Sequence, residues 1–470
     1  MNDSFFHAMF PSEVYQKRRK MLKELIPQGV ILFPGNREVP YNYPANTYRF
    51  RQDSSFSYFF GLHEPDLAGI IDPENDKEIL FGNDVNLEDI IWMGPQPLLR
   101  EKAAKVGIKD TFPLAALQDF IKKAQQAKRK IHYLPPYRSE VLLFLHNVLG
   151  INPGEVVSGA STDLIRAVVS LRSIKDEYEI AEIEKMVNVA KEMHTTVMRL
   201  AKSGRKEAEI AGIIEGIALA SGGASAYPVI LSKHGEILHN HSHNNILKAG
   251  DLLVTDAGAE SERLYASDIT RTVPVGGKFS ARQKEIYEIV LRAEINTIER
   301  MKPGKPHLEV HLAAARDIAS GLKEIGLMKG DVDEAVTSGA HALFFPHGLG
   351  HMLGMDVHDM EGLGEEFVGY DEEIKRIQQF GTAYLRLGKK LKPGFVLTDE
   401  PGIYFIPALI DSWYSERKFE QFINYPRVLE YKDFGGIRIE DNLLVTDTGC
   451  RVLGSPIPKT VKEVEEICRS

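Results

Sequence analysis

The stretch DLLVTDAGAESERLYASDITRT, residues 251–272, decides the fold of the second half of this chain. Two apolar runs typical of strands flank a polar turn at residues 260–262, which predicts a β-hairpin. Asp256 and Asp268 lie six residues on either side of Glu262, so a hairpin centred there would place their Cβ atoms ~5 Å apart. Carboxylates that close repel unless a proton or a cation lies between them, which makes the pair a candidate metal site. The alternative is two exposed acids beside a turn.

A second segment, FFPHGLGHMLGMDVHD at residues 344–359, carries three histidines. His347 and His351 have the i, i+4 spacing of a helical metal pair, but Gly348 and Gly350 disfavour a regular helix. The pattern therefore favours a loop or strand that presents one ligand together with supporting histidines. The alternative is a group of packed, hydrogen-bonded histidines without a metal.

Two glutamates follow at the ends of strand-like runs. Glu400 ends the run FVLTDE at residues 395–400 and precedes a proline, so its backbone should be extended and its side chain can project into a cleft. In GGIRIED, residues 435–441, Arg438 and Glu440 share one face of an alternating strand. Either glutamate alone is more often a solvated surface residue.

Together these segments supply four carboxylates and one imidazole. Two divalent cations carry four positive charges, which four carboxylates neutralise. Hard oxygen ligands with a single nitrogen favour manganese, cobalt or iron over a structural zinc site. Two such ions close together can bind and deprotonate a shared water and polarise a carbonyl group.

Length and composition narrow the class of protein. The chain has 470 residues, which predicts two domains, and its net charge of -9 disfavours a nucleic-acid partner. Cys450 and Cys468 are the only cysteines, and they form no CxxC pair, so neither a disulfide framework nor a thiolate zinc site is expected. The apolar runs are too short for a membrane, and the order of apolar and basic residues in 1–20 is wrong for a secretory signal. We therefore expect a cytoplasmic protein with no membrane partner.

The first third of the chain alternates strand-like and helical patterns. Apolar runs at residues 29–33 and 67–71 have the composition of buried strands, and residues 113–129 and 138–148 have helical spacing. This alternation predicts a smaller α/β domain over residues 1–170.

A charged helix with one apolar stripe opens the remainder of the chain. It is predicted from residues 175 to 200, and Asp176 suits its N-terminus. Helices and strands then alternate to the end of the chain, so we expect residues 171–470 to form the second domain. The fold class is therefore mixed α/β (α+β). The charged stretch 361–392 has the pattern of an inserted helix and loop.

The four segments, in this order and with similar gaps, resemble the signature segments of the creatinase–aminopeptidase family. The resemblance implies a pita-bread catalytic domain in residues 171–470. The domain before it resembles the N-terminal domain of aminopeptidase P in RQDSSF, residues 51–56, and in Trp92–Gly94. The resemblance also implies two divalent metal ions, manganese first, with cobalt, iron or zinc as alternatives. None of the ligands that it implies is substituted here: Asp256, Asp268, His351, Glu400 and Glu440.

The activity implied is hydrolysis of the Xaa-Pro bond by a metal-bridged hydroxide. By resemblance, Glu400 carries a proton from the water towards the leaving proline nitrogen, and His358 stabilises the tetrahedral intermediate. His239 would contact the substrate near the proline. His347 and Arg438 would contact the metal ligands and orient them without binding the metal themselves.

The substrate pocket has to accept a proline ring, because a proline nitrogen offers no N–H for recognition. Tyr227 or Phe345 could line it. A family arginine matching Arg386 contacts the free carboxylate of an Xaa-Pro dipeptide, which a bidentate guanidinium suits. The alternative for Arg386 is an ordinary surface arginine in a basic stretch.

Two activities of the family compete. Prolidase splits Xaa-Pro dipeptides, whereas aminopeptidase P removes the residue before proline from longer peptides. The runs YLR at residues 384–386 and GIYFI at residues 402–406 favour the prolidase type. The resemblance further implies a homodimer, in which the N-terminal domain of one subunit could shape its neighbour's cleft. A non-enzymatic binding protein or a metal-free creatinase-like hydrolase would require lost ligands, and the implied set is intact.

The sequence also departs from the family pattern. The gap of 12 residues between Asp256 and Asp268 is one longer than usual, which could shift the strand register. LSKHGE at residues 231–236 replaces a glycine-rich loop, and His241 and His243 have no assigned place.

Overall fold

The structure is a computed structural model that describes residues 9–470, so the expectation about a secretory signal rests partly on residues outside the described ones. The chain divides into two compact units. The first unit extends to Arg172 and includes Gly362–Phe367, and the second comprises Ser173–Glu361 and Val368–Ser470. Within residues 9–470, no helix has both the length and the apolar character needed to cross a membrane.

The first unit is built on one five-stranded sheet of order β6-β5-β4-β1-β7. Strand β1 pairs antiparallel with β4 and parallel with β7, and β5 pairs antiparallel with β4 and parallel with β6. The strands of this unit are β1 (Val30–Pro34), β2 (Pro40–Tyr43), β3 (Asn46–Thr47), β4 (Ala68–Asp72), β5 (Lys77–Phe81), β6 (Asp110–Phe112) and β7 (Ile131–His132). The predicted strands at 29–33 and 67–71 are thus confirmed as β1 and β4.

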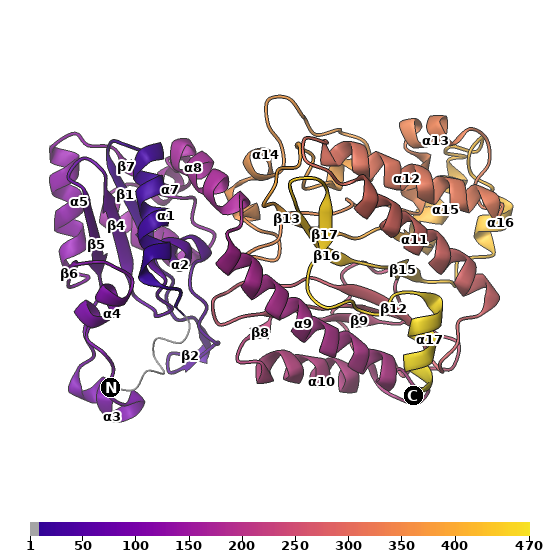
Figure 1. The fold of residues 1–470 in the computed structure, drawn as a ribbon, viewed down its shortest axis with the longest axis horizontal. Helices are drawn as coiled ribbons and strands as arrows, with labels where there is room; N and C mark the ends of the chain where they lie inside the picture. The colour runs from indigo at the N-terminus through magenta and orange to yellow at the C-terminus, as the bar shows by residue number, and fades with distance from the viewer. Residues whose placement is uncertain (1–8) are drawn as a thin grey trace. The chain divides into compact units, whose positions relative to one another are not determined.

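Helices cover both faces of this sheet, as Figure 1 shows for α1 and α5. Alternate residues of β1 point to opposite faces. Val30 and Leu32 join a core with residues of α5, α6 and α7, whereas the ring of Phe33 lies 4.9 Å from that of Phe59 in α2. The helices are α1 (Ser12–Leu25), α2 (Ser54–Phe60), α3 (Leu87–Met93), α4 (Leu99–Lys105), α5 (Ala116–Gln126), α6 (Ser139–Leu149), α7 (Pro153–Ser158) and α8 (Thr162–Ser173).

The second unit carries small sheets joined by single bridges. β10 pairs antiparallel with β9 and β12, β16 with β13 and β17, β14 with β15, and β11 with β8. A bridge between Thr270 and Glu440 connects the first of these sheets to the second. The strands are β8 (Ala224–Ser225), β9 (Ile230–Ser232), β10 (Leu252–Asp256), β11 (Ala259–Glu260), β12 (Thr270–Pro274), β13 (Val396–Asp399), β14 (Gly402–Tyr404), β15 (Gly436–Arg438), β16 (Asp441–Val445) and β17 (Cys450–Val452).

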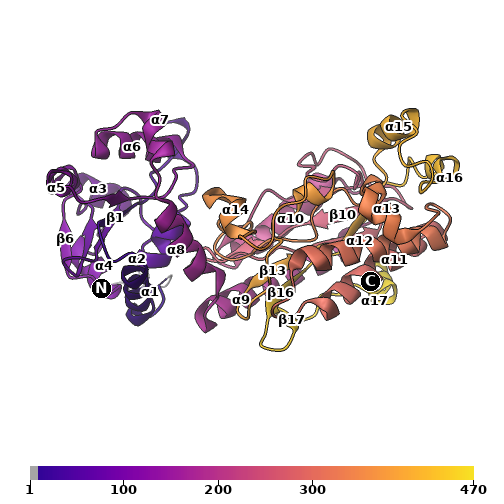
Figure 2. The same cartoon turned by 90° about the horizontal axis from the view of Figure 1, so that it is seen from above.

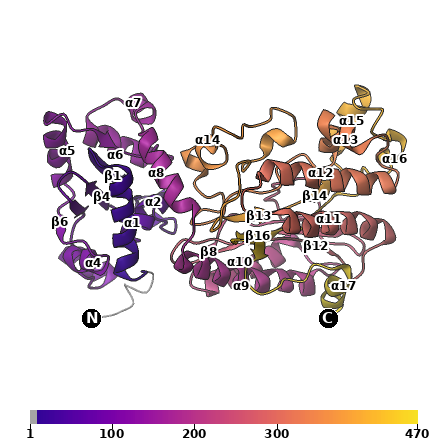
Figure 3. The same ribbon diagram turned by 45° about the horizontal axis from the view of Figure 1, so that its top comes forward.

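Two long helix pairs, α9 with α10 and α11 with α12, run along these strands (Figures 1 and 3). The predicted helix at 175–200 is confirmed as α9, and the Asp176 carboxylate caps it by accepting a hydrogen bond from the Glu179 N–H. Figures 1 and 2 both show α15 next to α16. The helices are α9 (Glu177–Leu200), α10 (Glu207–Ala220), α11 (Ala281–Arg300), α12 (His307–Glu324), α13 (Val332–Ser338), α15 (Pro407–Ser415), α16 (Tyr425–Leu429) and α17 (Val461–Arg469).

The predicted insert at 361–392 is mainly loop, with short helical turns. These are η3 (Glu361–Leu363), α14 (Glu365–Val368) and η4 (Thr382–Tyr384), and another such turn, η2 (Ala340–Leu343), precedes the histidine segment.

The predicted register of the 251–272 hairpin is wrong by two residues. Asp256 lies opposite Thr270 rather than Asp268, and Asp268 precedes β12. The hairpin keeps this register up to a turn at residues 261–265, because Glu260 bridges Ala266 and the Ser261 N–H donates to the Tyr265 carbonyl. The residues of β11 pair with β8 as well. An offset of two residues preserves the face on which a side chain points, so both acids still lie on one side.

The run 435–441 is likewise two strands rather than one. β15 ends at Arg438 and β16 begins at Asp441, and Glu440 lies between them in its bridge to Thr270.

Candidate active site

The ends of several strands converge on one region of the second unit. Asp256 ends β10, Glu400 follows β13 directly, and Glu440 precedes β16. His351 lies in a non-helical segment that runs along β13, because its carbonyl accepts from the Thr398 N–H at 3.0 Å. The expectation of a loop or strand in place of a helix is therefore confirmed.

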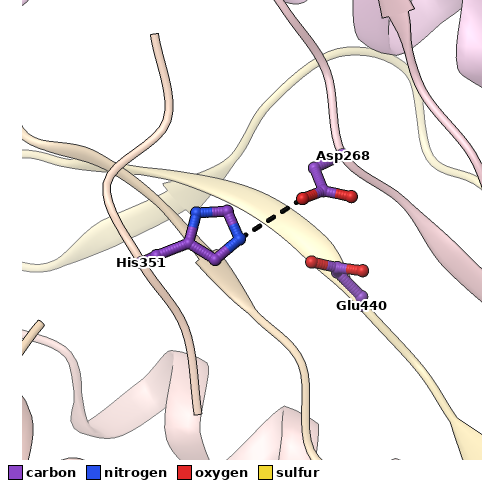
Figure 4. A group of neighbouring side chains, drawn as sticks. All are labelled: Asp268, His351 and Glu440. Carbon is purple, nitrogen blue, oxygen red and sulfur yellow. Dashed lines mark ion pairs between the residues drawn. The ribbon is translucent and has the colours of Figure 1, made fainter. Parts of the chain in front are cut away.

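Three of the predicted ligands lie within reach of one metal ion. Asp268, His351 and Glu440 are buried, and each offers one ligand atom within 4.8 Å of the others (Figure 4). The His351 Nε2 atom lies 3.3 Å from Asp268 Oδ2 and 3.7 Å from Glu400 Oε1. The Nδ1 atom of the same ring contacts the Met352 carbonyl at 3.0 Å, which directs Nε2 towards the acids.

The remaining acid, Asp256, is connected to Asp268 through Tyr227. The Tyr227 hydroxyl lies 2.5 Å from Oδ1 of each aspartate. A phenol has one proton, so it can fully satisfy only one of two carboxylates. The arrangement therefore retains excess negative charge at this point.

Arg438 supports the ligand carboxylates from one side. Its Nη2 donates to Asp256 Oδ2 at 2.6 Å, and its Nε donates to the Thr270 hydroxyl at 3.1 Å. That hydroxyl in turn donates to Glu440 Oε2 at 2.6 Å. Arg438 Nη1 donates to the Tyr404 hydroxyl at 2.8 Å, which also contacts His347 Nε2 at 2.9 Å.

Burial makes this group of acids electrostatically unfavourable without a cation. Desolvation raises the pKa of Glu440 well above its usual value, and it raises the pKa of Glu400 to about 7 despite the attraction of His351 and Arg438. Desolvation also raises the pKa of Asp256. Asp268 differs, because the hydrogen bond and charge of His351 outweigh its desolvation and lower its pKa.

The donor set therefore fits divalent cations. Four carboxylates and one imidazole face one another, most of them deeply buried, and the acids repel where no positive charge separates them. Hard oxygen donors with one nitrogen suit manganese, cobalt or iron.

A cavity of about 680 Å³ opens beside these acids. Three residues predicted to bind substrate line it, namely His239, His358 and Arg386. Its other side is partly apolar, which suits a proline ring; those residues are Leu238, Phe380, Tyr384, Ile406 and Leu409.

The predicted ring-binding role of Tyr227 and Phe345 is not supported by their positions. Neither residue is among those that line the cavity. Tyr227 contacts the two aspartates through its hydroxyl, and Phe345 is fully buried with its ring 4.9 Å from that of His347. His241 and His243 do not line the cavity either, and His243 Nδ1 contacts the Leu231 carbonyl at 3.0 Å.

His347 lines the cavity, and its Nδ1 lies 3.8 Å from Glu400 Oε2. Burial, reinforced by the charge of Arg438, lowers the pKa of His347 to about 3, so this imidazole is neutral.

Sequence reasoning missed three groups that support the site. Glu361 contacts both His358 Nδ1 and Arg386, the latter at 3.3 Å. The Asn442 side chain accepts from the Asp268 N–H at 3.0 Å and donates to the Asp268 carbonyl at 2.5 Å. The i, i+3 spacing of His358 and Glu361 was a usable signal for the first contact. Nothing local marked Asn442, because 174 residues separate it from Asp268.

Arg271 is the third group, fully buried behind the ligands. Its guanidinium donates to the Glu440 carbonyl at 2.7 Å and to Asp441 Oδ1 at 2.7 Å. It also donates to the carbonyls of Thr270, Ile457 and Pro458.

Matches between the sequence and protein-family models show which family the chain belongs to. Residues 181–447 match the family model described as metallopeptidase family M24. The chain belongs to metallopeptidase family M24. Residues 15–132 of this M24 chain match a second model, described as the aminopeptidase P N-terminal domain.

Curated relatives and solved structures agree with this assignment. The M24 chain is 33% identical to human Xaa-Pro dipeptidase over 456 residues, which cover 93% of this chain and 88% of the relative. It is 32% identical to "Probable Xaa-Pro aminopeptidase PEPP" of Podospora anserina, with 100% and 99% covered. The structure of Pseudomonas aeruginosa aminopeptidase PepP superposes with a TM-score of 0.81 at 28% identity, over 98% of each chain. The structure of zinc-substituted Escherichia coli aminopeptidase P in complex with product superposes with a TM-score of 0.80, also at 28% identity over 98% of each chain.

These matches confirm the predicted fold class. The chain has an aminopeptidase P-type N-terminal domain and a pita-bread catalytic domain of the M24 metallopeptidases.

Proposed function

We propose that this M24 enzyme hydrolyses the Xaa-Pro bond at the N-terminus of dipeptides and short peptides, with two divalent ions at its centre. One observation carries the proposal: Asp256, Asp268, His351, Glu400 and Glu440 come from distant parts of the chain and meet beside a cavity of about 680 Å³. The relatives named Xaa-Pro dipeptidase and Xaa-Pro aminopeptidase support the choice of substrate.

When bound, the two ions supply Lewis acidity, which lowers the pKa of water and polarises a carbonyl group. Those five residues would hold them, and manganese suits the donor set best. Glu400, which lies next to His351 and lines the cavity, would carry a proton from the water to the leaving proline nitrogen.

The residues that line the cavity take complementary roles in the proposal. His358 stabilises negative charge on the carbonyl oxygen, and His239 contacts the substrate near the proline. Arg438 holds Asp256 in position, and His347 reaches Arg438 through the Tyr404 hydroxyl. The apolar side of the cavity, including Leu238 and Leu409, accepts the proline ring.

Between the two activities we favour the prolidase type. Arg386 lines the cavity and carries a guanidinium that suits the free carboxylate of an Xaa-Pro dipeptide. Aminopeptidase P activity on longer peptides is the alternative, and the overlap with aminopeptidase P structures supports it.

We further propose that residues 1–170 act as the N-terminal domain and residues 171–470 as the catalytic domain of a homodimer. Apolar side chains on α3 support self-association, because Leu87, Ile91, Trp92 and Met93 are between 61% and 80% exposed. Light scattering measures the mass directly, and a monomer at micromolar concentration would contradict the dimer. Net charge and free cysteines agree with a cytoplasmic enzyme without a nucleic-acid or membrane partner, which fractionation of cells would test.

Turnover of Ala-Pro and Ala-Pro-Ala with manganese tests the function. The native enzyme should hydrolyse at least one of them and bind about two metal equivalents by elemental analysis. Asp268→Ala and Glu440→Ala should lose metal and at least about 100-fold in activity, because each removes a ligand.

Glu430→Ala provides a matched control, since this exposed acid pairs only with Arg427 among the described contacts. Full turnover by a metal-free Asp268→Ala sample would end the proposed mechanism. Arg386→Ala should impair Ala-Pro hydrolysis selectively, and an unchanged rate would remove the support for prolidase. A metal-free native protein that cleaves neither peptide would instead favour a binding protein on the same fold.

A further inference from the structure

Glu361 connects two residues of the cavity wall that the proposed function assigns to the substrate. Its Oε2 atom makes a short contact with His358 Nδ1 and lies 3.3 Å from Arg386 Nε. His358 and Arg386 line the cavity, whereas Glu361 is not among the lining residues. The carboxylate therefore reaches both side chains from behind the substrate space.

The charge state of Glu361 is fixed by these neighbours. The His358 hydrogen bond, with the charges of His358 and Arg386, lowers the pKa of Glu361 to about 2. Glu361 is thus an anion throughout the neutral range. Its side chain is 38% exposed and that of Arg386 is 35% exposed, so solvent only partly screens the pair.

A dipeptide carboxylate and Glu361 have the same chemistry, and both are attracted to the same guanidinium. An arginine that already faces one carboxylate exerts a weaker net attraction on a second, because the two anions repel each other. An uncharged group in the same place, such as a peptide or amide, meets no such repulsion. Glu361 should therefore weaken binding of free carboxylates more than binding of neutral C-terminal neighbours.

We propose that Glu361 is a positioning residue that sets specificity through Arg386, lowering the preference of the enzyme for substrates with a free carboxylate after proline. The proposal rests on the proposed Xaa-Pro activity.

The test compares Ala-Pro with Ala-Pro amide, which differ in the charge after proline. The measured quantity is the ratio of kcat/KM for the acid to kcat/KM for the amide. Glu361→Gln keeps an acceptor for His358 but removes the charge, so the ratio should rise about three- to tenfold. Effects on chemistry that the two substrates share cancel in this ratio. If turnover of the amide is too slow to measure, its inhibition constant against Ala-Pro replaces it.

Two further variants make the result specific. Glu373→Gln removes an equal charge from the same insert, where Glu373 pairs with Lys390, and should leave the ratio unchanged. In an Arg386→Ala background, Glu361→Gln should raise the ratio less, because the substrate carboxylate is then no longer drawn close to Glu361. The inference is overturned by an unchanged or lower ratio in Glu361→Gln, or by an equal rise without Arg386. Absence of any Xaa-Pro hydrolysis by the native enzyme would instead reject the proposed function.

Discussion

Tyr227 places a single phenol proton between two acids at the centre of the site. Its hydroxyl lies 2.5 Å from both Asp256 and Asp268, and desolvation together with these charges raises the pKa of the phenol well above its usual value. The group is therefore a donor at any ordinary pH. In the metal-free protein this donor stabilises the pair alongside Arg438 and His351, whereas a bound cation would compensate for its loss.

Tyr227→Phe is expected to destabilise the metal-free protein more than the manganese-loaded one. Removal of the hydroxyl leaves two nearly buried carboxylates without their shared donor, which costs about 1–3 kcal/mol when no cation compensates. Thermal unfolding of each protein after chelation and with manganese measures the difference.

Tyr265→Phe is a suitable comparison, because its hydroxyl donates to Glu179 at 3.1 Å, away from the metal ligands. This variant should lose similar stability with and without manganese. Equal losses for Tyr227→Phe in the two conditions would show that its hydroxyl does not compensate for the missing charge.

At the scale of elements, Arg271 connects three segments that surround the ligands. It belongs to β12, contacts Asp441 at the start of β16, and donates to carbonyls of residues 457 and 458. The guanidinium is fully buried, and it donates directly to the carbonyl of the predicted ligand Glu440. The position of Glu440 therefore depends on an arginine that does not enter the cavity.

Arg271→Met should lower the free energy of unfolding by about 3–5 kcal/mol, because it leaves buried carbonyls without their donor and Asp441 with Lys459 as its remaining ion-pair partner. Urea denaturation of the metal-free protein gives this value. Arg292→Met is the comparison, since both partners of its ion pair with Glu324 are exposed and the pair should contribute less than about 1 kcal/mol. Similar losses for the two variants would contradict the connecting role of Arg271.

Much of this arrangement could be predicted from local patterns. Apolar alternation identified β1, β4 and α9, and the spacing of acids and histidines identified a group that the fold brings together. The hairpin register could not be predicted, because the turn is centred on Arg263 rather than Glu262, and nothing in this polar run marks its central residue. Tyr227 was assigned to the pocket wall for a related reason: nothing local shows which of its groups, ring or hydroxyl, faces the acids.

At the scale of the whole molecule, buried neutral histidines set a limit on acid stability. Desolvation lowers the pKa of His194, His307 and His341 to about 4 each. In the unfolded chain the same imidazoles have a pKa of about 6.5. Between these values the folded state binds fewer protons than the unfolded state, so the free energy of unfolding falls as pH drops from about 6.5 to 4.

Because of each of these histidines, the free energy of unfolding should be roughly 2 kcal/mol lower at pH 5 than at pH 7.5. His307→Asn tests one of them, because asparagine can still donate to the Leu387 carbonyl, which His307 Nδ1 contacts at 2.8 Å, but does not titrate. Urea titrations at several pH values give the slope of the unfolding free energy against pH, which measures proton uptake on unfolding. In His307→Asn this uptake should be smaller by up to one proton. An unaltered slope for His307→Asn would show that another group governs the acid response.

The six residues 362–367 group with the first unit although the chain has already entered the second at residue 173. The polypeptide therefore passes from one unit to the other three times, after residues 172, 361 and 367. A gene fragment that starts at codon 173 would encode this short stretch without the surroundings in which it packs. Anyone who wishes to produce the catalytic half alone has to replace those six residues with a short linker, as well as choose a starting point.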